Sequence, residues 1–249
     1  MKNKSIKLLL VFSIILILFV SVYKCLFVRI QEDFVFRFTH EYHTPPHSKN
    51  EDLKNVRKLK QIDQLYIDLS EDITDIDFVS DYSKITLISI DPANSDFNLD
   101  SISKFTNLET LYLSGKAISD VQFLKGCTNL KTLHLSECKV MDITGISECS
   151  TLESIYIYSG GDYIKGLEEL SELPNLHHLS ISNASKYDME SISKIITLET
   201  LSILENRDPV DLSCLSGMKH LESLYIPIRN VLNAESLLNN PSLKKALQA

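Results

Sequence analysis

Residues 108–113 read Leu108-Glu109-Thr110-Leu111-Tyr112-Leu113, a phrase of the form L-x-x-L-x-L. Phrases of this kind recur every 22 to 24 residues and begin at Ile62, Ile85, Leu108, Leu130, Leu152, Leu176, Leu198, Leu221 and Leu243. A fixed period of this length indicates one small structural unit that stacks on copies of itself. We therefore predict eight full repeats and a partial ninth.

Each repeat combines two kinds of hydrophobic spacing. Within the phrase, apolar and polar residues alternate, as Leu133 and Leu135 do around His134, which is typical of a half-buried strand. A second apolar set follows at three-residue steps, as in Ile118 and Val121, which predicts a 3₁₀ or helical turn. The sequence thus predicts an α/β solenoid with a curved parallel sheet on its concave face and short 3₁₀ or helical returns on its convex face.

The repeats resemble the 22-residue leucine-rich repeats of bacterial surface proteins of the internalin-like group, whose unit reads L-x-x-L-x-L-x-x-N-x-I-x-D-I-x-x-L. The resemblance covers roughly residues 62–247. It is closest in the unit formed by Leu108, Leu111, Leu113, Ile118, Asp120, Val121 and Leu124. It implies the leucine-rich repeat fold and a binding role without naming a partner, because this group binds many unrelated partners.

The chain departs from the group at the asparagine place, whose side chain satisfies backbone groups in the turn after the strand. The residues at this place are Ser70, Ala93, Lys116, Cys138, Gly160, Ala184, Asn206 and Arg229. With a single asparagine among them, most of these turns must find other hydrogen-bond partners. We expect the turns to be less regular than in the group.

The N-terminal segment is predicted to be a signal anchor. Three lysines within residues 1–7 precede an apolar run, which extends over residues 8–28 if Lys24 reaches back to the lipid headgroups. The positive-inside rule then places residues 1–7 in the cytoplasm. We predict a protein of the cell membrane with one transmembrane helix at residues 8–28 and its repeats on the outer side.

Two alternatives stay open for this segment. It could be a secretory signal that is cleaved, so that the protein is secreted, or Cys25 could be lipidated. Both processes require small residues next to the processed position, whereas this region reads Ser21-Val22-Tyr23-Lys24. The uncleaved anchor is therefore preferred.

Between the anchor and the array we predict a juxtamembrane linker (29–50) and an N-terminal cap (51–61), followed by the repeat domain (62–249). Alternating phenylalanines indicate a short strand in the linker, at Phe34, Phe36 and Phe38. Apolar residues at three-residue steps predict a small helix in the cap, at Leu53, Val56 and Leu59. No polar cap is evident after the ninth phrase, so the tail itself or another chain must cover that edge.

The charge of the chain argues against nucleic acid as a partner. The formal net charge is −8, and five of the 25 basic residues but none of the 33 acidic residues precede residue 30. Residues 30–249 therefore carry 20 basic and 33 acidic side chains, a net charge of −13. A domain this acidic is repelled by nucleic acid and by anionic headgroups.

The candidate binding site lies at the outward places of the predicted strands. The middle outward place of each strand holds, in order, Tyr66, Ser89, Tyr112, His134, Tyr156, Ser180, Ser202 and Tyr225. We predict a ligand-binding patch on the concave face made of Tyr66, Tyr112, His134, Tyr156, Tyr158, His178 and Tyr225, because flat amphipathic rings on a rigid surface lose little entropy when they bind. Alternatively, these tyrosines only reflect strand propensity and pack against their cross-strand neighbours.

An acidic row stands at the first polar place of the phrases. It consists of Glu109, Glu153, Glu199 and Glu222, and Lys131 interrupts it. We interpret the row as a solvated rim of the sheet. It would favour a basic partner.

No pattern in the sequence indicates catalysis, a cofactor or a metal. In His40-Glu41-x-His43 the histidines stand three apart rather than the four that a zinc-protease helix requires. The sequence has no glycine-rich phosphate loop, and its first glycine is Gly115. Cys127 and Cys149 occupy the same place in adjacent repeats; we favour buried thiols over a disulfide. We predict no catalytic residue, no cofactor and no bound metal.

Together these features predict a non-enzymatic, membrane-anchored extracytoplasmic module that recognises a protein or a glycan through its concave face. The alternative is a structural or assembly protein of a membrane complex that uses its C-terminal edge or its convex side.

Overall fold

The computed structural model describes residues 40–45, 48–54, 61–68, 73–91, 97–116, 118–139, 142–159, 164–182, 184–205, 209–227 and 231–247. The chain divides into two compact units, Met1–Tyr42 and His43–Ala249. The predicted transmembrane helix and the phenylalanines of the predicted linker strand lie outside the described residues. Within the part that the structure describes, no helix has the length and apolar composition needed to span a membrane.

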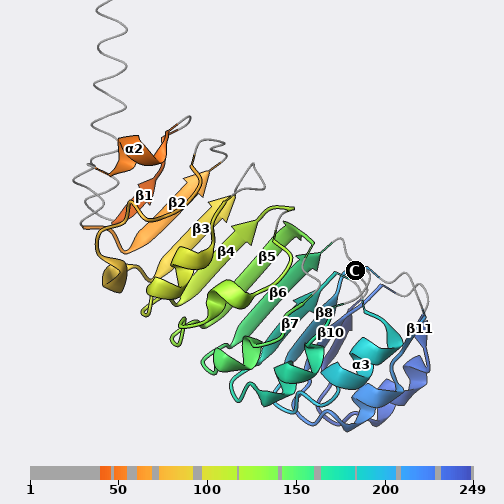
Figure 1. Ribbon diagram of the computed structural model, residues 1–249. Coiled ribbons are helices and arrows are strands. Elements are labelled where there is room, and N and C mark those ends of the chain that lie inside the picture. Colours follow the sequence, from red (N-terminus) through yellow and green to blue (C-terminus); the bar gives the residue numbers. More distant parts are fainter. Residues whose placement is uncertain are drawn as a thin grey trace, which may run out of the picture. The chain divides into compact units, whose positions relative to one another are not determined.

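Each of the nine phrases forms a strand, and these strands run parallel in one sheet (Figure 1). They are β2 (Gln64–Asp68), β3 (Leu87–Asp91), β4 (Thr110–Ser114), β5 (Thr132–Cys138), β6 (Ser154–Ser159), β7 (His178–Ile181), β8 (Thr200–Ile203), β10 (Ser223–Tyr225) and β12 (Lys245–Leu247). They follow one another in the sheet in chain order. The predicted parallel sheet and the phase of the repeats are confirmed.

Aliphatic side chains stacked from repeat to repeat form the core of the second unit. Leu111 lies in register with Ile88 on the preceding strand and with Leu133 on the following one. All three are fully buried, whereas Tyr112, one residue further along, is 38% exposed. Since burying such a side chain stabilises the fold by roughly 1.5 to 3 kcal/mol, this inward column holds successive coils together.

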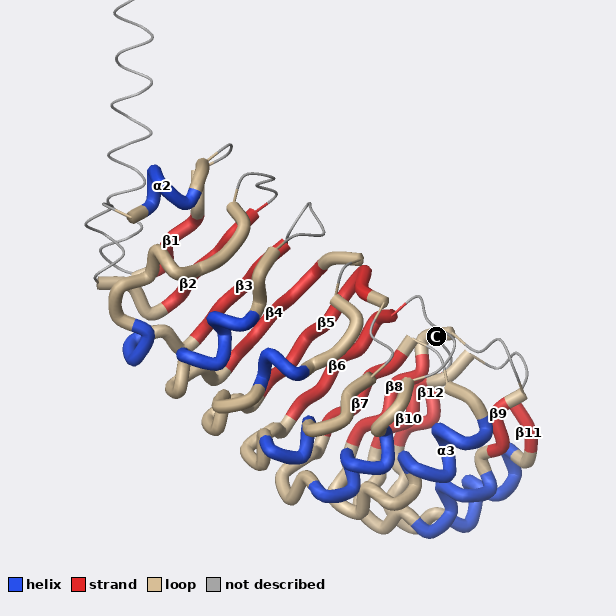
Figure 2. The backbone as a smooth tube through the Cα atoms, viewed as in Figure 1, coloured by secondary structure: helices blue, strands red, loops and turns tan. Residues whose placement is uncertain are grey.

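Short helical turns return the chain between strands, as the three-residue spacing predicted (Figure 2). The 3₁₀ turns are η2 (Tyr82–Lys84), η3 (Asp100–Lys104), η4 (Gln122–Leu124), η5 (Ile146–Glu148), η6 (Leu167–Glu172), η7 (Ser213–Gly217) and η8 (Ala234–Asn239). One return is an α-helix, α3 (Lys186–Ile192), which agrees with the predicted 3₁₀ or helical returns. A capping box begins this helix, because Ser185 accepts a bond from the Asp188 N–H and donates its own N–H to the Asp188 carboxylate.

Five of the returns are preceded by an Asp or Asn side chain that accepts an N–H from two residues further along. The donor–acceptor distances are 2.8 to 3.0 Å for Asp75, Asn98, Asp120, Asp142 and Asp211. This is the local bond by which Asx residues initiate turns. The aspartate of the repeat pattern is therefore a structural residue. Near the end of the array, β9 (Val210–Asp211) and β11 (Val231–Leu232) form a separate small parallel sheet.

Most turns at the asparagine place lie outside the described residues. After β5 the irregularity that we expected is visible, because Glu137 has a φ of 50° and the register with β6 shifts between Ser136 and Cys138. A ladder of side-chain hydrogen bonds, which the sequence analysis missed, lies just before the strands. Each bond is accepted by a backbone carbonyl about one repeat earlier, and the donors are the side chains of Asn107, Asn129, Thr151, Asn175 and Thr197.

A short helix stands near the start of the array, where we predicted a cap. It is α2 (Asn50–Leu53), and Leu53 is buried while Asn50 exchanges hydrogen bonds with Thr74. Val56 and Leu59 lie outside the described residues. The segment that we assigned to the linker contains β1 (Glu41–His43), so His43 stands on a strand.

Candidate binding face

The middle outward places of the strands lie side by side across the sheet. The pairing of β2 through β10 sets the following residues in register: Tyr66, Ser89, Tyr112, His134, Tyr156, Ser180, Ser202 and Tyr225. Neighbouring strands lie about 4.8 Å apart, so adjacent members of this row are within reach of one another. The row was predicted from the phase of the repeats alone.

Four of the seven predicted patch residues form one cluster of rings. His134 lies at its centre, with its ring centroid 5.5 Å from that of Tyr112, 5.5 Å from that of Tyr156 and 5.1 Å from that of Tyr158. The interplanar angles are 70°, 57° and 90°, so the rings meet edge to face or tilted, as aromatic pairs prefer. We call Tyr112, His134, Tyr156 and Tyr158 the ring cluster.

Packing within the ring cluster affects the chemistry of His134. Its Nε2 atom is buried and has no hydrogen-bond partner in the structure. Burial lowers the pKa of this imidazole below its ordinary value of 6.5, because the charged form loses hydration. His134 is therefore held as a neutral aromatic group at pH 7.

The other three predicted patch residues stand apart from the cluster. Tyr66 stacks on His43 with 4.4 Å between centroids and 5° between planes, and its hydroxyl donates to the Gln64 side chain. His178, on β7, lies in a different outward row, in register with Ser154 on β6 and Thr200 on β8. Tyr225 is separated from the cluster by the strands β7 and β8. The structure thus concentrates the patch on β4, β5 and β6.

The acidic row forms ion pairs along one end of the strands. Lys131 binds Glu109 at 2.9 Å, and Lys244 binds Glu222 at 2.7 Å. His177 Nδ1 lies 3.6 Å from a carboxylate oxygen of Glu199. Lysines of the same row therefore neutralise Glu109 and Glu222, and the charge available to a basic partner is smaller than the row of glutamates alone indicates.

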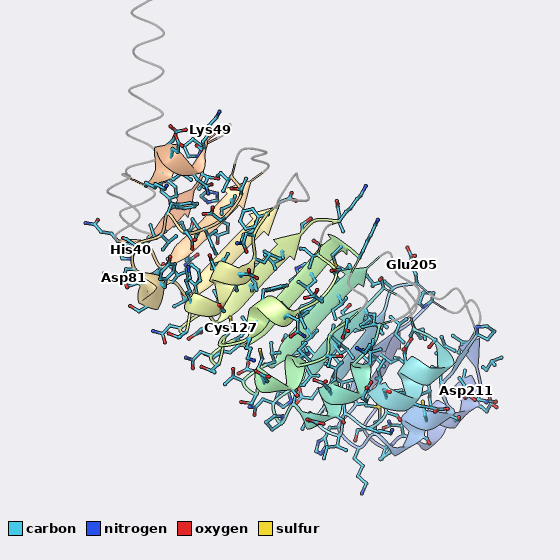
Figure 3. The ribbon with its side chains drawn as sticks, in the orientation of Figure 1. His40, Lys49, Asp81, Cys127, Glu205 and Asp211 are labelled. Carbon is cyan, nitrogen blue, oxygen red and sulfur yellow. The ribbon has the colours of Figure 1, made fainter. Side chains whose placement is uncertain are left out.

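Cys127 and Cys149 are buried free thiols, as favoured from the sequence. Cys127 is labelled in Figure 3. Each donates to a carbonyl of the preceding repeat, Cys127 to Ile102 and Cys149 to Leu124. Burial raises the pKa of Cys127 to about 12 and that of Cys149 to about 11. Neither thiol has the depressed pKa that a nucleophile or a metal ligand requires.

A pocket of about 250 Å³ lies on the side of the returns, lined by residues that include Phe97, Asn98, Asp120, Gln122 and Phe123. Its polar groups have structural partners, because Asn98 and Asp120 accept N–H groups of the following turns and the Gln122 amide donates to the Thr144 carbonyl. Among the described residues, no three His, Cys, Asp or Glu side chains are grouped to hold a metal.

Comparison with known proteins supports the fold. A family model described as leucine-rich repeats, in two copies, matches residues 106–148. No curated protein sequence matches the chain.

Solved structures with the same architecture come from two bacteria. The internalin inlF of Listeria monocytogenes is 19% identical with a TM-score of 0.53, over 81% of this chain and 68% of that one. A leucine-rich repeat protein of Leptospira interrogans is 14% identical with a TM-score of 0.52, over 82% of this chain and 59% of that one. At such identities the likeness concerns the fold. The chain therefore has the fold of leucine-rich repeat proteins, and its residues 106–148 match the repeat model itself.

Proposed function

We propose that this protein is a membrane-anchored, non-enzymatic module that binds a protein or a glycan through the exposed face of its sheet. The observation that supports this most directly is the ring cluster. Three tyrosines and a neutral histidine from three consecutive strands stand together on a rigid sheet, and Tyr112 remains 38% exposed. Preorganised rings of this kind lose little conformational entropy on binding, which is why tyrosine is common at binding hot spots.

The fold supports a binding role over a catalytic one. Leucine-rich repeat solenoids provide extended surfaces on which partners dock, and the outward row gives this chain such a surface. The buried thiols of Cys127 and Cys149 have raised pKa values, which is the opposite of what a nucleophile activated by a base requires.

Crosslinking of the full chain in its own cell tests this role. The Tyr112→Ala, Tyr156→Ala double variant should lose captured partner by at least about 30-fold, because truncating a hot-spot tyrosine costs roughly 1 to 2 kcal/mol or more. Ile196→Ala is the matched control, since Ile196 is an apolar side chain 74% exposed in the turn between α3 and β8. Circular dichroism must show that both variants fold. Equal capture by the double variant would exclude the ring cluster as the binding site.

The anchor at residues 8–28 and the extracytoplasmic side of the repeats are part of this proposal. They are supported by the apolar run and the lysines before it. Mass spectrometry of the protein from its own cell tests them: a membrane-bound chain with an intact N-terminus, whose repeats are digested by protease added outside, is expected. A soluble chain that begins after residue 20 would support the secreted alternative.

An assembly role is the second candidate, favoured by two exposed apolar side chains in the last repeat. Leu232 on β11 is 50% exposed and Leu238 is 88% exposed. Exposed aliphatic groups of this size are typical of contact surfaces. Light scattering tests this role, because association that rises with concentration and is abolished by Leu232→Ser with Leu238→Ser would favour assembly over ligand binding.

A further inference from the structure

The sheet face around the ring cluster is poor in charge. From β4 to β8, the described strand residues that alternate with the buried aliphatic side chains are serine, threonine, tyrosine and histidine, of which Ser180 is buried, and the charged exception is Glu137, exposed where β5 bulges. The serine, threonine, tyrosine and histidine residues, which we call the neutral face, are Thr110, Tyr112, Ser114, Thr132, His134, Ser136, Ser154, Tyr156, Tyr158, His178, Ser180, Thr200 and Ser202. In a chain with 23% charged residues, this composition separates the face from the remaining surface.

The four glutamates of the acidic row stand at one edge of the neutral face. Two of them, Glu109 and Glu222, are bound by lysines of the same row. A charged group on a partner would therefore lose hydration over the face without meeting an opposite charge. Charge complementarity thus points to an uncharged ligand.

The arrangement within the face matches the core of a protein–protein interface. Rings stand at the centre, hydroxyl groups surround them, and charged groups lie at the margin. Interface cores are depleted in charged residues and enriched in tyrosine, and serine beside tyrosine provides adaptable hydrogen bonds. A sugar ring would instead need an aromatic face to stack on, whereas these rings are packed against one another at 57° to 90°.

We propose that the partner is a protein whose contact surface is uncharged, formed by apolar, aromatic and amide side chains, and that it binds with little dependence on salt. This inference rests on the proposed function and specifies the ligand of the same face. The hydroxyl groups of the neutral face both donate and accept, so they suit peptide groups and side-chain amides of the partner. The net charge of −13 of residues 30–249 then plays no part in recognition.

Selection of a phage-displayed random dodecapeptide library on the full chain tests the proposal. The selected peptides should be poor in charged residues, and their affinity should change less than about twofold between about 50 and 500 mM salt, because screening acts only on charges. Thr132→Lys, which places a charge within the neutral face, should weaken them at least about tenfold, since it buries an unpaired ammonium. Glu153→Gln, which removes a charge at the margin, should have little effect.

The outcomes separate this inference from the proposed function. Peptides rich in charge that bind in a salt-sensitive way, but are lost in the Tyr112→Ala, Tyr156→Ala variant, would overturn the inference and keep the binding face. Selected peptides that bind this double variant unchanged would overturn both. A selection that yields no peptide dependent on the ring cluster, while neutral oligosaccharides bind the wild type and not the double variant, would replace the protein partner by a glycan.

Discussion

The imidazole of His134 packs at 90° against the ring of Tyr158, with 5.1 Å between the ring centroids. The two residues are diagonal neighbours, because His134 lies in register with Tyr156 and Tyr158 stands two places further along β6. Diagonal pairs across strands are within reach only of long or aromatic side chains. This contact joins two outward rows into one cluster and contributes to the burial of His134.

Protonation of His134 should destabilise the fold. Its pKa is lowered by burial, so the folded state binds this proton less readily than the unfolded chain does. The stability associated with neutral His134 is therefore complete above the ordinary pKa of 6.5 and is lost as the pH falls through 6.5 towards the lower folded value. In urea denaturation, the free energy of unfolding should fall more between pH 7.5 and pH 5.0 for the wild type than for His134→Phe. Equal losses would contradict this account of the cluster.

The ion pair between Asp142 and Lys165 should make a pH-dependent contribution to stability. The Lys165 ammonium, 2.8 Å away, and then Thr144 lower the pKa of Asp142 to about 2 from 3.8. A carboxylate with a lowered pKa stabilises the fold above 3.8, and this stabilisation is lost as the pH falls towards 2.

Asp142→Asn tests this pair, because asparagine keeps the Oδ1 acceptor for the Thr144 N–H but loses the charge. Asp120→Asn is the matched control, since Asp120 makes the same turn bond to Gln122 and the structure shows no lysine bound to it. In urea denaturation at pH 6, Asp142→Asn should be the less stable of the two, and the difference should narrow as the pH approaches 3. A constant difference would show that charge is not its cause.

The ladder before the strands should stabilise the stacking of repeats. The Asn129 amide donates to the Thr106 carbonyl of the preceding repeat at 2.7 Å. Asn129→Ala should lower the free energy of unfolding by about 0.5 to 1.5 kcal/mol, the net contribution of one such bond. Lys125→Ala, at an exposed place after η4, should change it by less than about 0.5 kcal/mol. If the two substitutions have the same effect in urea denaturation, the ladder is not stabilising.

The thiols of Cys127 and Cys149 should be unreactive in the folded protein. With pKa values of about 12 and about 11, caused by burial, almost none of either group is thiolate at pH 8. Iodoacetamide followed by peptide mass mapping should find both cysteines unmodified in the native protein and both alkylated after unfolding in urea. Rapid native alkylation, or a peptide mass two daltons lower that marks a disulfide, would contradict the assignment.

Local pattern alone predicted the strands, the helical returns and the outward row. Alternation in each phrase specifies which side chains face inward, and a near-constant period carries that phase from coil to coil. The column of Ile88, Leu111 and Leu133 and the row that contains Tyr112 and His134 follow directly from this. The same reasoning predicted 3₁₀ or helical returns without distinguishing the two types, and the capping box at Ser185 and Asp188 marks the α-helical return, α3.

Which rings touch was decided only by the tertiary structure. The repeat phase placed seven rings on one face, but contact depends on side-chain rotamers and on neighbours from other strands, which no single repeat specifies. Tyr66 stacks on His43, a residue from before the array, and so stands apart from the ring cluster, whereas Tyr158 joins His134 across a diagonal. The sequence determined the coil and the composition of its face, and packing between coils determined where on that face a binding cluster forms.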